Sequence, residues 1–259
     1  MKVVLFCGGQ GMRLRDMPEP VPKPMASIGY RPLLWHLMKY YSHYGHRDFI
    51  LCLGYRADVI KSYFLNYNEC ESNDFVLSNG GKTIELLRKD IEDWRITFVD
   101  TGLKSNVGQR LLRVRHLVEG DEMFLANYAD GLTDLPLDTL TDYFVRQNKV
   151  ACFMGVKPTA SFHVANVEPN GAVRSIDHIS QSGSLVNGGF FVFKREIFNY
   201  INEGEELVEQ PFHRLINEKQ LAAYPYGGFW ACMDTFKEKQ QLEELYSRGN
   251  PPWEVWRSL

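Results

Sequence analysis

The sequence from Val3 to Lys23 reads VVLFCGGQGMRLRDMPEPVPK, and the fold is decided by this stretch. Its first four residues are an apolar run that predicts a buried strand. Three glycines follow within the four positions 8–11, where a backbone without side chains turns tightly and approaches a ligand closely. Successive N–H groups of such a turn bind anions, and Arg13 adds a positive charge. Lys23 lies between two prolines that stiffen its loop, so the stretch predicts a polyphosphate site.

Two common phosphate-binding patterns do not fit this loop. The phosphate loop of many NTPases ends in Gly-Lys-Ser/Thr, whereas Gly11 is followed here by Met12 and Arg13. The dinucleotide fingerprint requires a third glycine at the position of Leu14. A glycine-rich turn of an arbitrary α/β protein is the simpler interpretation, and the coupled Arg13 and Lys23 argue against it.

Length and composition narrow the class of protein. The 259 residues are 44% apolar, enough for one large domain with a substantial core. A net charge of −3 without a basic run argues against a nucleic-acid partner. The five cysteines are scattered and odd in number, which argues against a disulfide framework. No signal peptide or apolar run of membrane length is found, so we expect a cytoplasmic protein with no membrane partner.

Hydrophobic periodicity predicts that strands and helices alternate along the chain. Further strands are expected at residues 48–53, 95–100, 122–127, 150–156, 187–193 and 221–225. Helices are expected at residues 32–45, 57–67, 108–117, 137–147, 194–202, 209–218 and 235–247. Residues 68–93 form a polar excursion with weak strand content, and Pro169-Asn170-Gly171 predicts a hairpin turn. This order predicts an α/β, doubly wound, mainly parallel, Rossmann-like sheet with a small antiparallel insertion.

Two aspartates lie at the ends of predicted elements. Asp130 follows a predicted strand, and Asp234 precedes the last predicted helix. Ligands of open α/β sheets bind beyond the carboxyl ends of the strands, where Asp130 lies. A carboxylate there suits Mg²⁺, and Asp234, just before the last helix, is the candidate for a second ligand. The alternatives are a turn residue for Asp130 and a helix N-cap for Asp234.

The chain resembles the sugar nucleotidyltransferases, and among them most closely the cytidylyltransferases, in an ordered series of segments over its whole length. The matching segments are Gly8 to Leu14, Pro22 to Met25, Leu34 to His36, Gly54-Tyr55, Asp100 to Gly102, Arg110-Leu111, Asp130-Gly131, Asn187 to Phe191, Gly228 to Trp230, Met233 to Thr235 and Pro252-Trp253.

The resemblance implies transfer from a nucleoside triphosphate, with CTP favoured, to a phosphorylated acceptor, with glucose 1-phosphate favoured. It implies Mg²⁺ on Asp130 and Asp234, with Arg13 and Lys23 as catalytic cations. It further implies a single domain with a nucleotide-binding half at 1–134 and an acceptor-binding half at 135–259, in a homo-oligomer. The implied nucleotide-binding residues are Gly8, Gly9, Gly11, Met12, Arg13, Ser105, Arg110 and Ala129. The acceptor-binding candidates are His163, His178, Asn187 and Gly188.

The acceptor side departs from the family pattern. A Glu-Lys-Pro segment usually follows the hairpin and holds the sugar and its phosphate, whereas the best alignment here gives His178 and Ile179. His163 stands in another altered segment, and Ala129 replaces a glycine. His163 and His178 lack a third partner at zinc spacing, so zinc is not expected.

Three interpretations remain open for the altered acceptor side. The first is ordinary use of glucose 1-phosphate through a rearranged contact, or through a hairpin that is aligned differently. The second is another phosphorylated acceptor with weak use of glucose 1-phosphate, because Ile179 offers no cation to the acceptor phosphate. The third is a nucleotide-binding regulatory protein without turnover. The retained Arg13, Lys23, Asp130 and Asp234 argue against the third.

Overall fold

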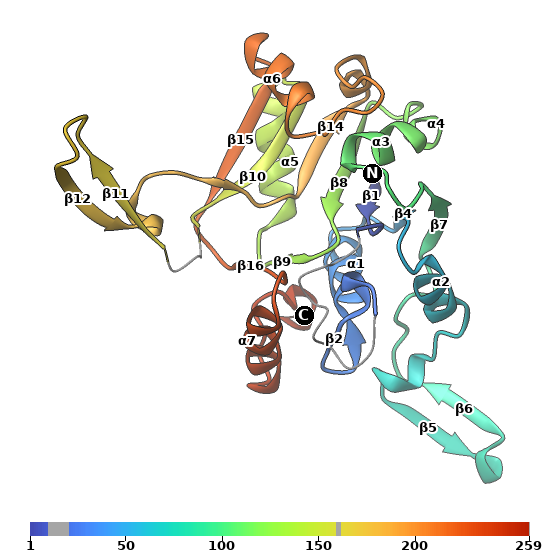
Figure 1. Ribbon diagram of the computed structural model, residues 1–259. Coiled ribbons are helices and arrows are strands. Elements are labelled where there is room, and N and C mark those ends of the chain that lie inside the picture. The colour runs from blue at the N-terminus through green and yellow to red at the C-terminus, as the bar shows by residue number, and fades with distance from the viewer. Residues whose placement is uncertain (10–20, 159–161, 259) are drawn as a thin grey trace.

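A computed structural model describes residues 1–9, 21–158 and 162–258, and its centre is a mainly parallel sheet (Figure 1). Strand β14 (Phe191–Lys194) runs antiparallel to both of its neighbours, β10 (Ala151–Val156) and β8 (Met123–Tyr128). The other long strands of the sheet run parallel to one another. The short strand β13 (Val186–Asn187) pairs with the far end of β10. Across the sheet the order is β15 (Leu221–Tyr226), β10 (Ala151–Val156), β14 (Phe191–Lys194), β8 (Met123–Tyr128), β1 (Lys2–Phe6), β4 (Asp48–Leu53) and β7 (Arg95–Asp100).

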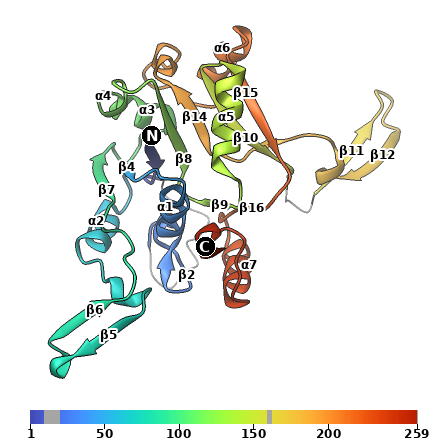
Figure 2. The ribbon, with the colours of Figure 1, turned by 180° about the vertical axis from the view of Figure 1, so that it is seen from behind.

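Both faces of this sheet are covered, because alternate side chains of each strand enter different cores. Val3 and Leu5 of β1 belong to one core, and Val4 and Phe6 belong to the other. The first core also takes side chains from α1 (Leu33–His43), α2 (Ala57–Leu65), α5 (Leu137–Gln147) and α7 (Phe236–Ser247). The second takes them from α3 (Val107–Arg113), α4 (Arg115–Val118), α6 (Gln210–Asn217) and the 3₁₀ helix η6 (Arg195–Asn199). Seen from behind, α5 lies over β10 and β15 (Figure 2). The predicted doubly wound α/β fold is confirmed.

The strand order reverses at β1. From β1 the chain passes to β4 and then β7 on one side, and it returns to place β8 on the other side of β1. Ligands of open α/β sheets bind in the crevice beyond the carboxyl ends of strands at such a reversal. The ends of β1 and β8, at Phe6 and Tyr128, are therefore where the fold favours a site.

Three of the predicted elements are wrong in detail. The helix predicted at 108–117 is divided at Val114, whose φ of −101° and ψ of 4° are not helical. The strand predicted at 187–193 is interrupted between β13 and β14, where Phe190 has a φ of +50°. The helix predicted at 194–202 is the short η6, which has only five residues. Apolar spacing predicted these segments correctly as buried, but it does not report a local backbone break.

Among the described residues, four small two-stranded sheets lie outside the central sheet. The polar excursion contains the hairpin β5 (Phe75–Ser78) and β6 (Thr83–Leu86), and the predicted hairpin is β11 (His163–Val167) and β12 (Val173–His178). These two hairpins project from opposite ends of the molecule (Figure 1). The other pairs are β2 (Ser27–Ile28) with β3 (Arg31–Pro32), and β9 (Gly131–Thr133) with β16 (Trp230–Cys232).

In the part of the chain that the structure describes, five further segments are short 3₁₀ helices. They are η2 (Lys23–Met25), η3 (Glu69–Glu71), η4 (Asn79–Gly81), η5 (Ile179–Gln181) and η7 (Val255–Ser258). Within the described parts of the chain, no helix has the length and apolar character needed to cross a membrane.

Candidate active site

The small β9–β16 sheet brings together two aspartates that are distant in sequence. Asp130 directly precedes β9, and Asp234 follows β16 by two residues. Gly131 pairs with Cys232 across this sheet, and the Met233 N–H donates to the carbonyl oxygen of Asp130 at 2.8 Å. The two carboxylates therefore lie side by side at the carboxyl end of β8.

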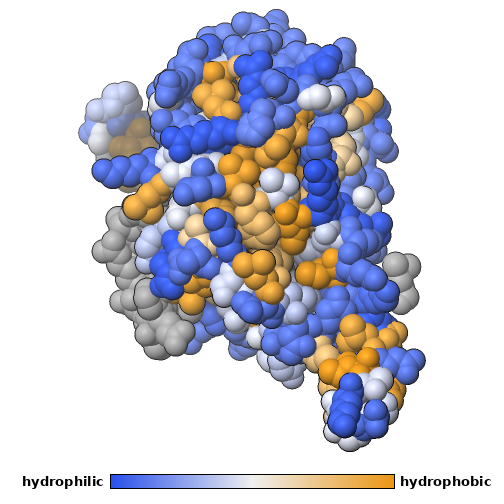
Figure 3. Space-filling view, turned by 90° about the vertical axis from the view of Figure 1, so that its right-hand side faces the viewer, coloured by the Kyte–Doolittle hydropathy of each residue, from blue (hydrophilic) through white to orange (hydrophobic). Residues whose placement is uncertain are grey.

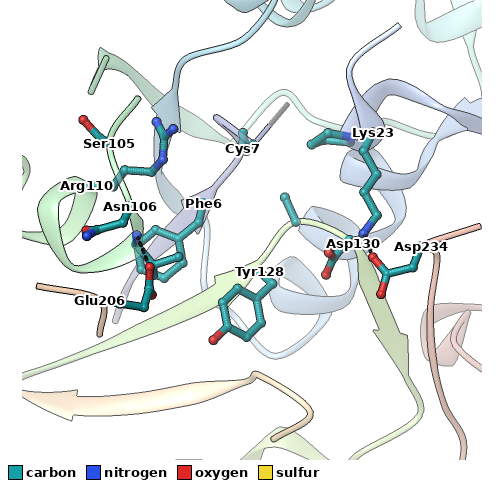
Figure 4. Close-up of a pocket in the computed structure, with 14 residues that line it drawn as sticks. Phe6, Cys7, Lys23, Ser105, Asn106, Arg110, Tyr128, Asp130, Glu206 and Asp234 are labelled. Atoms are coloured by element: carbon teal, nitrogen blue, oxygen red, sulfur yellow. Dashed lines mark hydrogen bonds and ion pairs between the residues drawn. The ribbon is translucent and has the colours of Figure 1, made fainter. Parts of the chain in front are cut away.

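Lys23 lies between these two carboxylates (Figure 4). Its Nζ is 2.6 Å from Oδ2 of Asp130 and 2.5 Å from Oδ1 of Asp234. Burial alone would lower the pKa of Lys23, but the charge and hydrogen bonds of Asp130 and Asp234 outweigh burial and raise it. Lys23 is therefore protonated throughout the neutral range, and it marks the point where both carboxylates converge.

The helix-cap interpretation of Asp234 is wrong. The N-cap of α7 is Thr235, whose side chain accepts a hydrogen bond from the N–H of Glu238. Glu238 in return accepts from the N–H groups of Thr235 and Asp234, both at 2.7 Å, which completes a capping box. The side chain of Asp234 is thus directed to Lys23 and not to the helix.

A cavity of about 500 Å³ opens at the ends of β1 and β8 and includes the two aspartates and Lys23 (Figure 4). The cavity is also lined by four of the residues predicted to bind the nucleotide, which are Gly9, Ser105, Arg110 and Ala129. Their contacts with a nucleotide stay a prediction. Gly11, Met12 and Arg13 lie outside the described residues, so their predicted roles stay open.

Gly8 is required here because Arg110 passes directly against it. A Cβ at Gly8 would be 2.0 Å from Nη1 of Arg110. The Arg110 guanidinium donates to the carbonyls of Leu53 and Gly8, each at 3.0 Å, and to Oγ1 of Thr101 at 2.7 Å. Since these groups follow β4, β1 and β7, the buried Arg110 ties together three strand ends at the floor of the site.

Asn187 and Gly188, two of the acceptor-binding candidates, lie next to the pocket residue Tyr128. Nδ2 of Asn187 donates to the Tyr128 hydroxyl at 3.3 Å, and Nε1 of Trp230 donates to the carbonyl of Gly188 at 3.0 Å. Gly188 also leaves room for Met154, whose methyl carbon would be 3.1 Å from a Cβ there. Their position agrees with an acceptor side next to the carboxylates.

The two candidate histidines are not at the pocket. His163 and His178 pair directly across the β11–β12 ladder, with ring centroids 5.4 Å apart. Nδ1 of His178 lies 2.7 Å from Oγ of Ser180. Neither histidine is among the residues around the cavity. The structure brings the two aspartates and Lys23 together there, whereas Asn187 and Gly188 do not line the cavity and Asn187 reaches it only through Tyr128.

Interpretation of the sequence missed several residues that line the cavity. They are Phe6, Cys7, Pro24, Asn106, Val107, Tyr128 and Glu206. Tyr128 directly follows the strand predicted at 122–127 and precedes Asp130 by two residues, so its position beyond a strand end could have identified it. Glu206 lies in an irregular segment without a motif, so only the three-dimensional structure identifies it.

The described residues contain no cluster of three or more His, Cys, Asp or Glu side chains with the geometry of a metal site. Two converging carboxylates remain, and two is the number that Mg²⁺ commonly takes from a protein when water and phosphate supply its other ligands. The donor set of Asp130 and Asp234 therefore fits Mg²⁺ bound together with a phosphorylated substrate, and it does not fit a metal enclosed by protein ligands.

Comparison with known proteins gives concordant results. The family model described as Nucleotidyl transferase matches residues 2–237. Over 258 residues, 99% of this chain and the full length of each relative, the sequence is 38% identical to a glucose-1-phosphate cytidylyltransferase of Salmonella typhimurium and 36% identical to a "Probable glucose-1-phosphate cytidylyltransferase" of Bacillus subtilis. A UDP-glucose pyrophosphorylase bound to UDP-glucose has a similar fold, with a TM-score of 0.69 at 17% identity, covering 95% of this chain and 98% of that chain.

Proposed function

The chain belongs to the nucleotidyl transferase family, and on this basis we propose that it transfers a cytidylyl group from CTP to glucose 1-phosphate. The products are CDP-glucose and pyrophosphate. The observation that carries the reaction class is the convergence of Asp130, Asp234 and Lys23 on one point where the strand order reverses. The choice of CTP and glucose 1-phosphate is supported by the full-length relatives.

Mg²⁺ is part of this proposal, with Asp130 and Asp234 as its protein ligands. When bound, the ion would neutralise charge on the phosphates of the reacting substrates. Two carboxylates held by one small sheet provide a preorganised pair of hard oxygen ligands. The Lys23 ammonium contacts both carboxylates, and this supports the pair as a place where positive charge is bound.

In the proposed reaction a phosphate oxygen of glucose 1-phosphate attacks the α-phosphorus of CTP. The new P–O bond forms as the bond from the α-phosphorus to the bridging oxygen breaks, and pyrophosphate leaves with the electron pair. Lys23, and Arg13 as predicted from the sequence, stabilise the negative charge of the departing group. No covalent protein nucleophile is needed, because positioning and charge stabilisation dominate such transfers.

Cys7 is the one thiol beside the described part of the cavity, and its chemistry agrees with this mechanism. Burial raises the pKa of Cys7 well above its ordinary value, so the thiol is not ionised near neutral pH. A thiol acts as a nucleophile in its ionised form. Cys7 is therefore a packing residue at the end of β1, and catalysis by substrate positioning does not require it.

A different phosphorylated acceptor is the second candidate. It is favoured by the separation of His163 and His178 from the cavity and by Ile179 at the position where the family usually has a lysine. The conventional acceptor is favoured by the full-length relatives. Asn187 beside Tyr128 serves either acceptor, because its amide and the tyrosine hydroxyl both bind sugar-type hydroxyls.

The test is a matrix of nucleoside triphosphates against phosphorylated acceptors, scored by release of pyrophosphate with Mg²⁺ present. The highest rate is expected for CTP with glucose 1-phosphate. A higher rate with another acceptor would favour the second candidate. Absence of pyrophosphate from every pair would support the nucleotide-binding regulatory protein instead.

A cytoplasmic homo-oligomer completes the proposal. The location is supported by the five cysteines, which are all free, as expected in a reducing compartment. Oligomer formation is supported by apolar side chains exposed on the β5–β6 hairpin, described below. Cell fractionation and light scattering test the two parts separately.

A further inference from the structure

Glu206 lies at the end of the cavity opposite to Asp130 and Asp234 (Figure 4). Its segment connects η6 and α6 and is distant in sequence from the glycine loop and both aspartates. Ser105 and Asn106 line the same end of the cavity. The site therefore has a phosphate end, defined by the aspartates and Lys23, and a second end that carries its own carboxylate.

The Glu206 carboxylate is fixed against the first turn of α3. Its Oε2 accepts a hydrogen bond from the N–H of Val107 at 3.3 Å, and its Oε1 accepts from the N–H of Leu207 at 3.0 Å. The loop of Glu206 is seated closely on this helix, since a Cβ at Gly108 would be 2.3 Å from the carbonyl oxygen of Glu205. Glu206 is thus held in one place beside the cavity and is not a free surface side chain.

The carboxylate of Glu206 retains acceptor capacity. An ionised carboxylate has about four acceptor positions, and the N–H groups of Val107 and Leu207 occupy two of them. Among the described residues, no lysine or arginine forms an ion pair with Glu206. The nearby Arg110 directs its guanidinium to backbone carbonyls and Thr101. A half-buried acceptor without a cation is therefore available to a ligand.

A carboxylate distinguishes the two kinds of pyrimidine. Cytosine has an exocyclic amino group that donates to a carboxylate, whereas uracil and thymine have a carbonyl oxygen at the same position. Two acceptors facing each other leave both unpaired, and an unpaired polar group in a pocket is costly. If the phosphates of the nucleotide bind at the carboxylate–lysine end, as the proposed function requires, the opposite end of the cavity, with Ser105, Asn106 and Glu206, is left for the base.

We propose that Glu206 is a specificity-determining residue that accepts a hydrogen bond from the amino group of cytosine and excludes uracil and thymine. This inference rests on the proposed function, because it takes the cavity to be the nucleotide site. Beside the carboxylate, Oγ of Ser105 donates to the carbonyl of Thr101. The Asn106 side chain, the N-cap of α3, accepts from the N–H of Gln109 at 2.8 Å and donates to the carbonyl of Gly204 at 2.9 Å. These two side chains therefore shape this end of the cavity, and the free acceptor positions there are those of Glu206.

The experiment measures binding, so it does not depend on turnover. Calorimetric dissociation constants for CTP and UTP are determined with Mg²⁺ and without an acceptor, for the wild type, Glu206→Gln and Glu206→Ala. Glu203→Gln, an exposed carboxylate-to-amide change in the same segment, is the matched control. Thermal unfolding and circular dichroism establish that each variant is folded, and the glutamine variant keeps the size of the side chain and an acceptor oxygen.

The wild type and Glu203→Gln should both bind CTP at least about tenfold more tightly than UTP, as expected for a charge-assisted hydrogen bond to one base only. Glu206→Ala should lose most of this ratio. Glu206→Gln should also gain affinity for UTP, because its amide can donate to the uracil carbonyl. Both results would support the inference.

Three results would overturn the inference. Equal weakening of CTP and UTP binding in both Glu206 variants would show that the side chain only supports α3. A CTP-to-UTP ratio that is unchanged in both Glu206 variants would show that the carboxylate does not contact the base. A wild type without preference for CTP would also refute it. By contrast, CTP selectivity through Glu206 without any pyrophosphate release would refute the proposed function and leave this inference intact.

Discussion

Lys23 is the residue at which the charges of the site meet. Replacing Lys23 by alanine should lower kcat/KM by about 100- to 1000-fold, which corresponds to about 2.7–4 kcal/mol in the activation barrier, because a preorganised positive charge beside the transferring phosphate is lost. Steady-state release of pyrophosphate measures the effect, and Lys61→Ala, an exposed lysine of α2, is the control. A folded Lys23→Ala protein with near-normal turnover would show that the lysine only pairs with the carboxylates.

Asp130 and Asp234 should each determine the Mg²⁺ requirement. Asp130→Asn and Asp234→Asn keep the shape of the side chain but remove a negative charge, so half-maximal activity should need a Mg²⁺ concentration raised by about tenfold or more. The measurement is a Mg²⁺ titration of initial rate, with the exposed Asp138→Asn as control. An unchanged titration for Asp234→Asn would remove this residue from the proposed metal pair.

The sequence analysis named Lys23, Asp130 and Asp234, which the structure brings together, but it did not name Glu206. Asp130 directly follows the end of a strand, and Lys23 lies between two prolines. Both are local patterns that indicate a side chain presented to a ligand. Asp234 needed the family resemblance, because before a helix an aspartate is equally suited to capping. Glu206 depends on how an irregular loop seats on α3, and no local periodicity encodes such a tertiary contact.

Among the elements, α1 and the C-terminal segment are joined through a buried histidine. Nε2 of His36, in α1, is 3.0 Å from the carbonyl oxygen of Ile28. Nδ1 of the same ring accepts a hydrogen bond from Nε1 of Trp253 at 3.3 Å. Burial lowers the pKa of His36 from its ordinary value of 6.5 to about 4. The folded protein therefore keeps this ring neutral at a pH where the unfolded chain protonates it.

Stability should consequently fall as the pH drops from about 6.5 towards 4, and His36 should contribute no slope above that range. At pH 5 the loss attributable to His36 is about 2 kcal/mol, from 1.36 kcal/mol for each pKa unit. Burial raises the pKa of the neighbouring Glu254, which gives an opposite and partly offsetting dependence. Urea unfolding at pH 7 and pH 5 should show a smaller difference for His36→Gln than for the wild type or exposed His116→Gln. Equal differences in all three proteins would contradict this role.

Element boundaries were predictable where periodicity was strong. The helix α5 and the strands β4 and β7 match their predicted ranges, because each carries a regular apolar pattern with clear ends. The division at Val114 and the left-handed Phe190 were not predictable, because neither position is a glycine or proline. Phe190 is held in this conformation by burial and by a hydrogen bond from its N–H to Oδ1 of Asn127 at 2.9 Å. Such a tertiary contact leaves no trace in local sequence.

At the scale of the whole molecule, the β5–β6 hairpin projects from the body but is firmly joined to it. The buried Arg31 donates to Oγ of Ser72 at 2.7 Å and to the carbonyl of Asn68 at 2.7 Å, at the base of the excursion. Asp90, at its other end, pairs with Lys39 of α1 at 2.8 Å. The hairpin is therefore held in a defined orientation. The sequence predicted this segment only as a polar excursion with weak strand content.

One face of this hairpin is apolar and uncovered in the chain. Phe75 pairs with Leu86 and Leu77 with Ile84, so these four side chains share a face. Leu77 and Ile84 are 58% and 55% exposed. Figure 3 shows the corresponding apolar surface on the projecting lobe. A two-stranded hairpin is marginally stable by itself, so a partner surface is expected to cover this face.

A second copy of the chain is the expected partner. The β11–β12 hairpin at the opposite end also exposes apolar side chains, Ile176 at 63% and Val173 at 57%, so each molecule offers two apolar surfaces for head-to-tail association.

Light scattering after size-exclusion chromatography should show a homo-oligomer for the wild type. Leu77→Ser combined with Ile84→Ser should shift it to smaller species, because burial of each side chain contributes about 1.5–3 kcal/mol. Val76→Ser changes the other face of the same strand, beside Glu85, and should leave the oligomer intact. A monomeric wild type, or equal dissociation by Val76→Ser, would show that the apolar face does not hold copies of this chain together.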